Sequence, residues 1–254
     1  MKVRRRDFLE GSLSSLVTLA FLDSVVRAHG AAPAISPILE SWLRGLHAHS
    51  ADLHGGAIAA AAWQREVQSL LERVPLEDLM SFIELEDLMK TVALPDDRAT
   101  ARDPVFPPLE GLAPIGSYIR RVFLMQKGRA IVPHGHRNMV SGHLVMHGGV
   151  HVRHYERLAD EPGYMIVKPT IDRESTPGMA TTVSDEKDNV HWLTATTDIA
   201  CTFDVIVVDL DPSRPTEFMD FIDPRAAEPH EGGALRAPRL QADEVFLRYG
   251  KTTV

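Results

Sequence analysis

The stretch "GRAIVPHGHRNMVSGHLVMHG", residues 128–148, decides the fold. An apolar run leads into His134 and His136, which one glycine separates, and a glycine stands at each end of the stretch. In an extended strand, alternate side chains point to the same face. We therefore expect His134 and His136 to project together, as two ligands of one metal ion would. The alternative is a pair of solvent-exposed loop histidines.

The residues that follow predict how the next strand is oriented. If the alternation continues, Ser141, His143 and Val145 share one face of that strand. A third metal ligand then has to come from a strand far along the chain, and His191 in "NVHWLTA" is the best candidate. His143 is the alternative, either as a replacement ligand or as a hydrogen-bond donor beside the ligands.

Other titratable groups near these strands have competing interpretations. A carboxylate from the acidic run "SDEKD", at Asp185, Glu186 or Asp188, would turn the site into the two-histidine, one-carboxylate type of many non-haem iron enzymes. Three histidines flank a turn and are expected to face solvent: His147, His151 and His154.

The second half of the sequence is typical of an all-β domain. From Ser117 onward, short alternating or β-branched runs are separated by turn residues, and we expect a sandwich or barrel. The nine candidate strands are "SYIRRVFLM", "RAIVPH", "GHLVMHG", "VHVRHYERL", "YMIVKPTI", "ATTVS", "NVHWLTA", "CTFDVIVVDL" and "EVFLRYG". Gly148-Gly149 predicts a hairpin turn between two of them.

Residues 36–94 have the periodicity of helices. Ser36 followed by Pro37 is a cap and first-turn pair, and apolar residues then recur at spacings of three and four. A second helix is expected over 57–73, and a third runs on from Pro75 through "PLEDLMSFIELEDLMKTVAL". Residues 95–116 are rich in proline and predict a linker, so the expected barrel spans 117–254.

The N-terminus has the order of parts of an export signal. A basic start precedes a short apolar run over 13–22, which is too short to span a bilayer, and small residues follow. The string "RRDFL" at residues 5–9 resembles the twin-arginine signal, so residues 1–30 are expected to be removed on export from a bacterial cytoplasm. The alternative is a basic amphipathic helix. The mature chain would be periplasmic or secreted and not membrane-spanning.

Composition excludes several classes of protein. The net charge of -8 and the absence of a basic stripe argue against a nucleic-acid partner. A hydrophobic content of 44% suits a globular domain that buries a core. The single cysteine, Cys201, excludes an internal disulfide framework and a cysteine-rich metal site, and a buried apolar role is the common fate of such a residue.

The central stretch also resembles the first motif of the cupin barrels. The pattern Gly128, five residues, His134, Gly135, His136, four residues, Ser141, six residues, Gly148 matches that motif, except that a glutamate usually stands where Ser141 does. Because it lacks this carboxylate but retains a late histidine, the sequence is similar to the three-histidine thiol dioxygenases, most closely the cysteamine dioxygenase and plant cysteine oxidase group. The resemblance implies an all-β double-stranded β-helix preceded by an α-helical region.

That resemblance carries implications for function. It implies Fe(II), or another divalent metal, held by His134, His136 and His191, and oxidation of a small thiol by dioxygen to a sulfinate. Substrate-orienting candidates lie on neighbouring strands, although each of these residue types is more often structural: Arg153 and Tyr155 first, then Arg120, Arg121 and Tyr249. The alternative is a cupin that binds a metal or small ligand without turnover.

Overall fold

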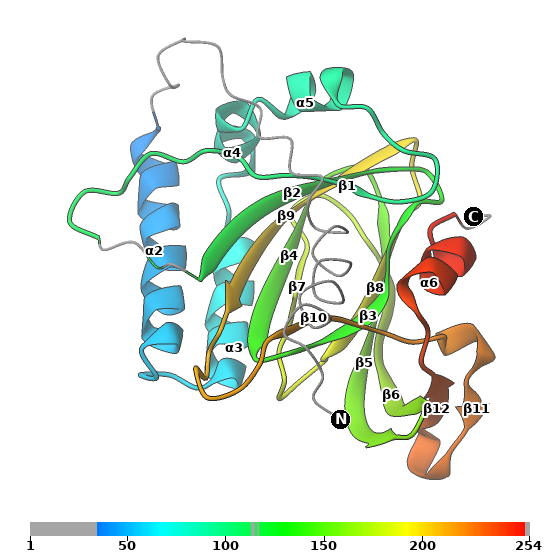
Figure 1. Ribbon diagram of the computed structural model, residues 1–254. Helices are drawn as coiled ribbons and strands as arrows, with labels where there is room; N and C mark the ends of the chain where they lie inside the picture. The colour runs from blue at the N-terminus through cyan, green and yellow to red at the C-terminus, as the bar shows by residue number, and fades with distance from the viewer. Residues whose placement is uncertain (1–34, 113–114, 116, 252–254) are drawn as a thin grey trace, which may run out of the picture.

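The computed structural model describes residues 35–112, 115 and 117–251, and the predicted export signal lies outside them. Within this part of the chain, helices come first and a β-barrel follows, as Figure 1 shows. No helix among the residues described is long and apolar enough to cross a membrane.

The predicted helical region is confirmed, with one correction. Its helices are α2 (Pro37–His54), α3 (Ala60–Leu71), α4 (Leu76–Phe82) and α5 (Leu85–Thr91). The Ser36 side chain caps α2 by accepting a hydrogen bond from the Leu39 backbone N–H at 3.2 Å. The third predicted helix is broken into α4 and α5, because Glu84 adopts a left-handed conformation with φ of 55°.

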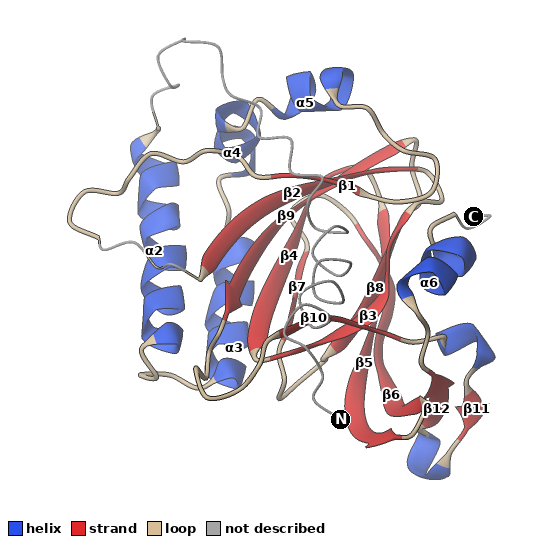
Figure 2. Ribbon diagram, viewed as in Figure 1, coloured by secondary structure: helices blue, strands red, loops and turns tan. Residues whose placement is uncertain are grey.

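Eight of the nine predicted strands are confirmed and build the barrel (Figure 2). They are β2 (Tyr118–Gln126), β3 (Ala130–Arg137), β4 (Met139–His147), β5 (Val150–Glu161), β6 (Tyr164–Ser175), β7 (Ala180–Val183), β8 (Val190–Ala195) and β9 (Ile199–Val208). One sheet has the order β2-β9-β4-β7 and the other β3-β8-β5-β6, and all pairs are antiparallel. Nested pairing of β2 with β9, β3 with β8, β4 with β7 and β5 with β6 is the order of a jelly roll, the double-stranded β-helix of cupins.

The hairpin predicted at Gly148-Gly149 is wrong. The strands on its two sides, β4 and β5, belong to different sheets, so they cannot form a hairpin. The two glycines instead carry the chain from the sheet of β4 to the sheet of β5. Gly148 has φ of 71°, and a Cβ there would lie 2.2 Å from the Ile199 carbonyl oxygen, so no larger residue fits this corner.

Further elements extend both sheets. β1 (Thr100–Arg102), within the predicted linker, adds to β2. Beyond the barrel, β10 (Glu217–Phe221) adds to β3. β12 (Leu235–Pro238) adds to β6, and β11 (Glu228–Pro229) adds to β12. The ninth predicted strand, "EVFLRYG", is instead part of helix α6 (Ala242–Tyr249), whose start is set by a capping box between Gln241 and Glu244.

The helices cover one outer face of the barrel. Apolar side chains of β2, β4 and β9 point outward into a core shared with α2 and α3. Figure 1 shows these two helices beside that sheet. Gly142 lies on this outward face, because a Cβ there would contact Leu71 and Val67 of α3. Alternation along β4 therefore puts Ser141, His143 and Val145 on one face, as the sequence predicts, and this face is the barrel interior.

Candidate metal centre

The structure brings His134, His136 and His191 together inside the barrel. One ring nitrogen from each can be chosen so that all three lie within 4.8 Å of one another. His134 and His136 come from alternate positions of β3, and His191 is the register partner of His134 on the neighbouring β8. The ring centroids of His134 and His191 are 4.3 Å apart, and all three side chains are buried. The geometry is that of a site for one metal ion.

Backbone carbonyls fix the tautomer of two of these rings. His134 Nδ1 lies 2.7 Å from the Val132 carbonyl oxygen, and His136 Nδ1 lies 2.5 Å from the Phe218 carbonyl oxygen. Because a carbonyl oxygen only accepts, each Nδ1 carries the proton and each Nε2 keeps a free lone pair. A hydrogen bond from the second nitrogen to a carbonyl is the arrangement that orients histidine ligands of metals.

Burial keeps the three imidazoles neutral at pH 7. Desolvation lowers the pKa of His134 to about 4. It lowers the pKa of His136 and His191 well below their ordinary value, and the charge of neighbouring histidines adds to the effect. Within the part of the chain described, His191 Nδ1 is buried and has no hydrogen-bond partner. Neutral rings with an unsatisfied nitrogen suit a bound cation, so the residues present fit a metal ion.

A row of polar side chains faces the histidines from the opposite sheet. Arg121, Asp204, His143 and Thr181 are register partners across β2, β9, β4 and β7. His143 Nδ1 lies 2.7 Å from the Asp204 carboxylate, and the His143 ring centroid is 4.7 Å from that of His191. His143 Nε2 is buried and, among the described residues, has no hydrogen-bond partner. It is therefore available to a ligand that enters the barrel.

The structure supplies no carboxylate from the acidic loop to this centre. Asp185 accepts hydrogen bonds from the Asn138 backbone N–H at 2.9 and 3.0 Å, and Glu186 accepts one from Ala61 of α3. Asp188 pairs with Lys187 at 3.9 Å. Among the described residues only His134, His136 and His191 group as metal ligands, so the two-histidine, one-carboxylate alternative has no support there.

The orienting residues predicted on β5 lie on the other face of their strand. Arg153 stacks 4.3 Å over the Trp192 ring, outside the barrel. Tyr155 packs outside it as well, in a cluster with Val190. The structure therefore places both away from the three histidines.

The other candidates are also held by neighbours. Arg121 points inward but forms a bidentate pair with Asp103 at 2.6 and 2.9 Å. Arg120 stacks on Phe106, and Tyr249 donates a hydrogen bond to Asp223. Cys201 is buried beneath the helices, and burial raises the pKa of its thiol to about 12, which confirms its apolar role.

One of the histidines expected in solvent is buried instead. His154 has no exposed surface, and its ring centroid lies 6.2 Å from that of His191. It is the register partner of His191 on β5, so the alternation that turns Val150 and Val152 inward turns it inward too. The prediction for His154 is wrong because the strand period, and not the nearby turn, sets the direction of this side chain.

Two contributors to the centre were missed by sequence reasoning. Asp204 occurs within the apolar strand "CTFDVIVVDL", and a lone carboxylate in such a strand was a signal of a buried partner. Phe218 contributes only its backbone carbonyl, for which a sequence carries no signal.

A scan against protein-family models finds no match, and a search of curated proteins finds none. Solved structures do match. KdgF from Halomonas sp. is 15% identical over 46% of this chain and 84% of its own, with a TM-score of 0.31. A cupin superfamily protein from Desulfitobacterium hafniense is 9% identical over 48% of this chain and 88% of its own, with a TM-score of 0.32. Procruciferin, an 11S globulin from Brassica napus, is 11% identical with a TM-score of 0.29, and the match spans 37% of this chain and 21% of that chain.

At such identities and TM-scores these similarities carry no argument about function. The strand order is the evidence for the fold, and the geometry of the histidines is the evidence for the site. The chain has a cupin barrel fold, and its interior holds a buried three-histidine group that can bind a metal ion.

Proposed function

We propose that this protein is a non-haem iron-dependent dioxygenase that oxidises a small thiol to a sulfinate. One observation carries the proposal: three buried neutral histidines form the centre, and Ser141 stands where cupins usually have a carboxylate ligand. Imidazole suits iron, as it also suits zinc, copper and nickel.

The charge of such a centre favours an anionic substrate. Three neutral imidazoles leave about three open positions on an octahedral divalent ion and neutralise none of its charge. A thiolate supplies that missing negative charge. Bound Fe(II) would supply the dioxygen chemistry, in which both oxygen atoms are transferred to sulfur, the thiol proton is released and no external reductant is needed.

The chain's own residues would orient the substrate and exclude water. The Asp204 carboxylate holds the proton on His143 Nδ1, so that Nε2 can accept a hydrogen bond from a polar group of the substrate. Apolar side chains fill the barrel interior and keep bulk water from the centre: Met125, Ile131, Val145, Val150, Val152, Leu193, Ala195 and Ala200.

One observation favours the second candidate, a cupin that binds a metal or small ligand without turnover. The space that His143, Ser175 and Thr181 line inside the barrel is too small for a water molecule. The three histidines are themselves buried, and a centre without room for a substrate beside them would only hold its metal.

Oxygen consumption by the full chain tests the proposal. The protein is loaded anaerobically with Fe(II) and mixed with cysteine, cysteamine or a peptide that begins with cysteine. We expect thiol-dependent oxygen uptake and a product heavier by two oxygen atoms, both absent in His134→Ala/His136→Ala. Bound iron without uptake for any thiol would contradict the dioxygenase and leave the second candidate.

Export through the twin-arginine route is part of this proposal. It is supported only by the sequence of residues 1–30. Fractionation of a bacterial host that expresses the full chain tests it: we expect a shortened protein in the periplasm, and Arg5→Lys/Arg6→Lys should leave the precursor in the cytoplasm. An unprocessed cytoplasmic protein would contradict export.

A further inference from the structure

Strand β10 bulges where it passes the metal centre. Glu217 pairs with Arg137 of β3 and Asp220 pairs with Gly135, so Phe218 and Met219 both fall opposite the single residue His136. Two residues opposite one define a β-bulge, which interrupts the ladder and redirects the groups within it. Bulges of this kind occur beside functional sites.

The bulge turns a backbone carbonyl toward a metal ligand. The Phe218 carbonyl oxygen lies 2.5 Å from His136 Nδ1 and accepts a hydrogen bond from it. The position of this carbonyl fixes the rotation of the His136 ring and therefore the direction of the Nε2 lone pair. If β10 shifts, His136 loses both its orientation and the hydrogen bond that makes Nε2 a better ligand.

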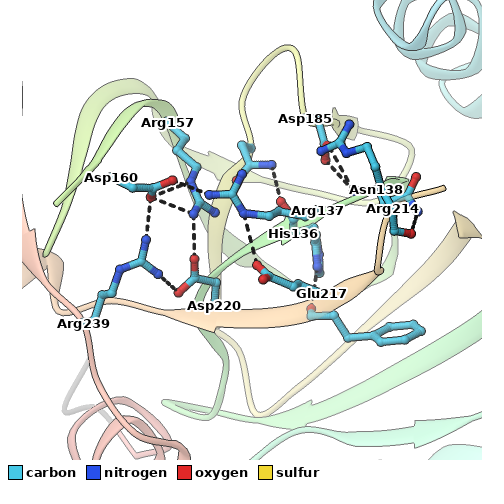
Figure 3. Close-up of polar contacts among 12 residues, drawn as sticks. His136, Arg137, Asn138, Arg157, Asp160, Asp185, Arg214, Glu217, Asp220 and Arg239 are labelled. Atoms are coloured by element: carbon cyan, nitrogen blue, oxygen red, sulfur yellow. Dashed lines mark hydrogen bonds and ion pairs between the residues drawn. The ribbon is translucent and has the colours of Figure 1, made fainter. Parts of the chain in front are cut away.

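Ion pairs secure β10 on both sides of the bulge. Before it, Glu217 pairs with Arg137 at 3.1 Å. After it, Asp220 pairs with Arg157 of β5 at 2.8 Å and with Arg239, which follows β12. Asp160 joins the three arginines into one network, drawn in Figure 3. We call this network the ionic clamp; its members are Arg137, Arg157, Asp160, Glu217, Asp220 and Arg239.

The key pair of the clamp is shielded from solvent. The side chains of Arg157 and Asp220 are 9% and 14% exposed, so salt and water screen their attraction less than at an ordinary surface pair. Arg157 reaches β10 across Gly135, where a Cβ would lie 3.6 Å from its guanidinium. The clamp lies on the outer face of the sheet, whereas His134 and His136 point inward.

We propose that the ionic clamp is a positioning device for the metal centre. It holds the β10 bulge in place and with it the Phe218 carbonyl oxygen. This oxygen orients the His136 ring through the hydrogen bond that it accepts from Nδ1. Its six members are positioning residues, since they act on the metal only through this carbonyl. The inference rests on one part of the proposed function, the binding of a divalent metal by the three histidines, and does not depend on the dioxygenase reaction.

Arginine variants separate positioning from simple electrostatics. Loss of an arginine removes positive charge near the centre, and through-space electrostatics alone then predicts tighter cation binding. Loss of the clamp predicts weaker binding. Asp220→Asn does not discriminate, because both effects weaken binding. Arg157→Gln and Arg239→Gln are therefore the informative changes, and Arg239, with a side chain 26% exposed, tolerates substitution if Arg157→Gln fails to fold.

The test measures Zn(II) affinity of the full chain by competition with a chelator. We expect Arg157→Gln and Arg239→Gln each to raise the Kd for Zn(II) about tenfold, the lower end of the effect of removing an outer partner of a metal ligand. In the Zn(II)-loaded protein the Nδ1–H resonance of His136 should shift while that of His134 stays. Arg44→Gln, which breaks the Arg44–Glu40 pair at 2.7 Å on α2 and removes the same charge outside the clamp, is the matched control and should leave both readouts unchanged.

An unchanged or lower Kd in both arginine variants would overturn the clamp. Failure of the unaltered protein to bind Zn(II) would overturn the clamp and the proposed centre together. Missing oxygen uptake in a protein that binds metal and loses affinity in both variants would contradict only the dioxygenase, so the two failures are distinguishable.

Discussion

Replacement of His154 by leucine should remove a large share of the acid sensitivity of the apoprotein. His154 is fully buried, and neither ring nitrogen has a hydrogen-bond partner among the described residues. Burial lowers its pKa from 6.5 to about 3. In the unfolded chain this histidine therefore binds a proton below about pH 6.5, whereas in the folded chain it binds one only below about pH 3. Folding stability is lost as the pH falls through this window.

The magnitude follows from linkage. At pH 5 the pH lies about 1.5 units below the pKa of an unfolded histidine. Protonation then stabilises the unfolded chain, and so lowers the free energy of unfolding, by about 2 kcal/mol for each histidine that stays neutral in the folded state. Burial also lowers the pKa of His134 to about 4 and holds those of His136 and His191 well below their ordinary value. All four histidines therefore oppose folding as the pH falls from 7 toward 5. His154→Leu removes one of the four shares.

Urea unfolding of the metal-free protein at pH 7 and pH 5 measures the effect. We expect the loss of unfolding free energy between the two pH values to be about 2 kcal/mol smaller in His154→Leu. Stability at pH 7 should be equal or higher by about 1–3 kcal/mol, because unsatisfied buried nitrogens are removed. His147→Gln, at an exposed strand end, is the control. An identical pH dependence in His154→Leu and the unaltered protein would refute a neutral buried histidine.

Three further predictions concern residues around the centre. In Gly135→Ala the new Cβ would lie 2.7 Å from Asn189 Oδ1, so thermal unfolding should show a loss of about 1–3 kcal/mol, and an unchanged Tm would contradict the close contact. Ser141→Glu places a carboxylate on the inward face and should lower the Kd for Zn(II) in a chelator competition, whereas weaker binding would show that this side chain does not reach the ion. Asp204→Asn removes the charged acceptor of His143 Nδ1 and should cost about 1.5–3 kcal/mol in urea unfolding at pH 7, while full stability would mean that the pair is dispensable.

The sequence was most informative where a short-range period determines the structure. Alternation along β3 correctly predicts that His134 and His136 project together, and the spacing of three and four correctly predicts α2. His191 was found from its position at the start of a late strand, and the structure makes it the register partner of His134.

Errors arose where a local pattern competes with the topology. Gly148-Gly149 has the composition of a hairpin turn, but the jelly roll sends its two strands to different sheets. The segment "EVFLRYG" has strand-like residues, but the capping box that begins at Gln241 lies just before it and starts a helix. The ionic clamp joins residues from β3, β5, β10 and the segment after β12, a combination that only the folded sheet reveals.

Metal content tests the central claim most directly. The full chain and His134→Ala/His136→Ala are purified in parallel, loaded anaerobically with Fe(II), freed of unbound ions and analysed by mass spectrometry. Three neutral histidines that converge within 4.8 Å predict one metal ion per chain in the unaltered protein and none in the variant. No bound metal in either protein, or equal metal in both, would contradict a metal centre at these histidines.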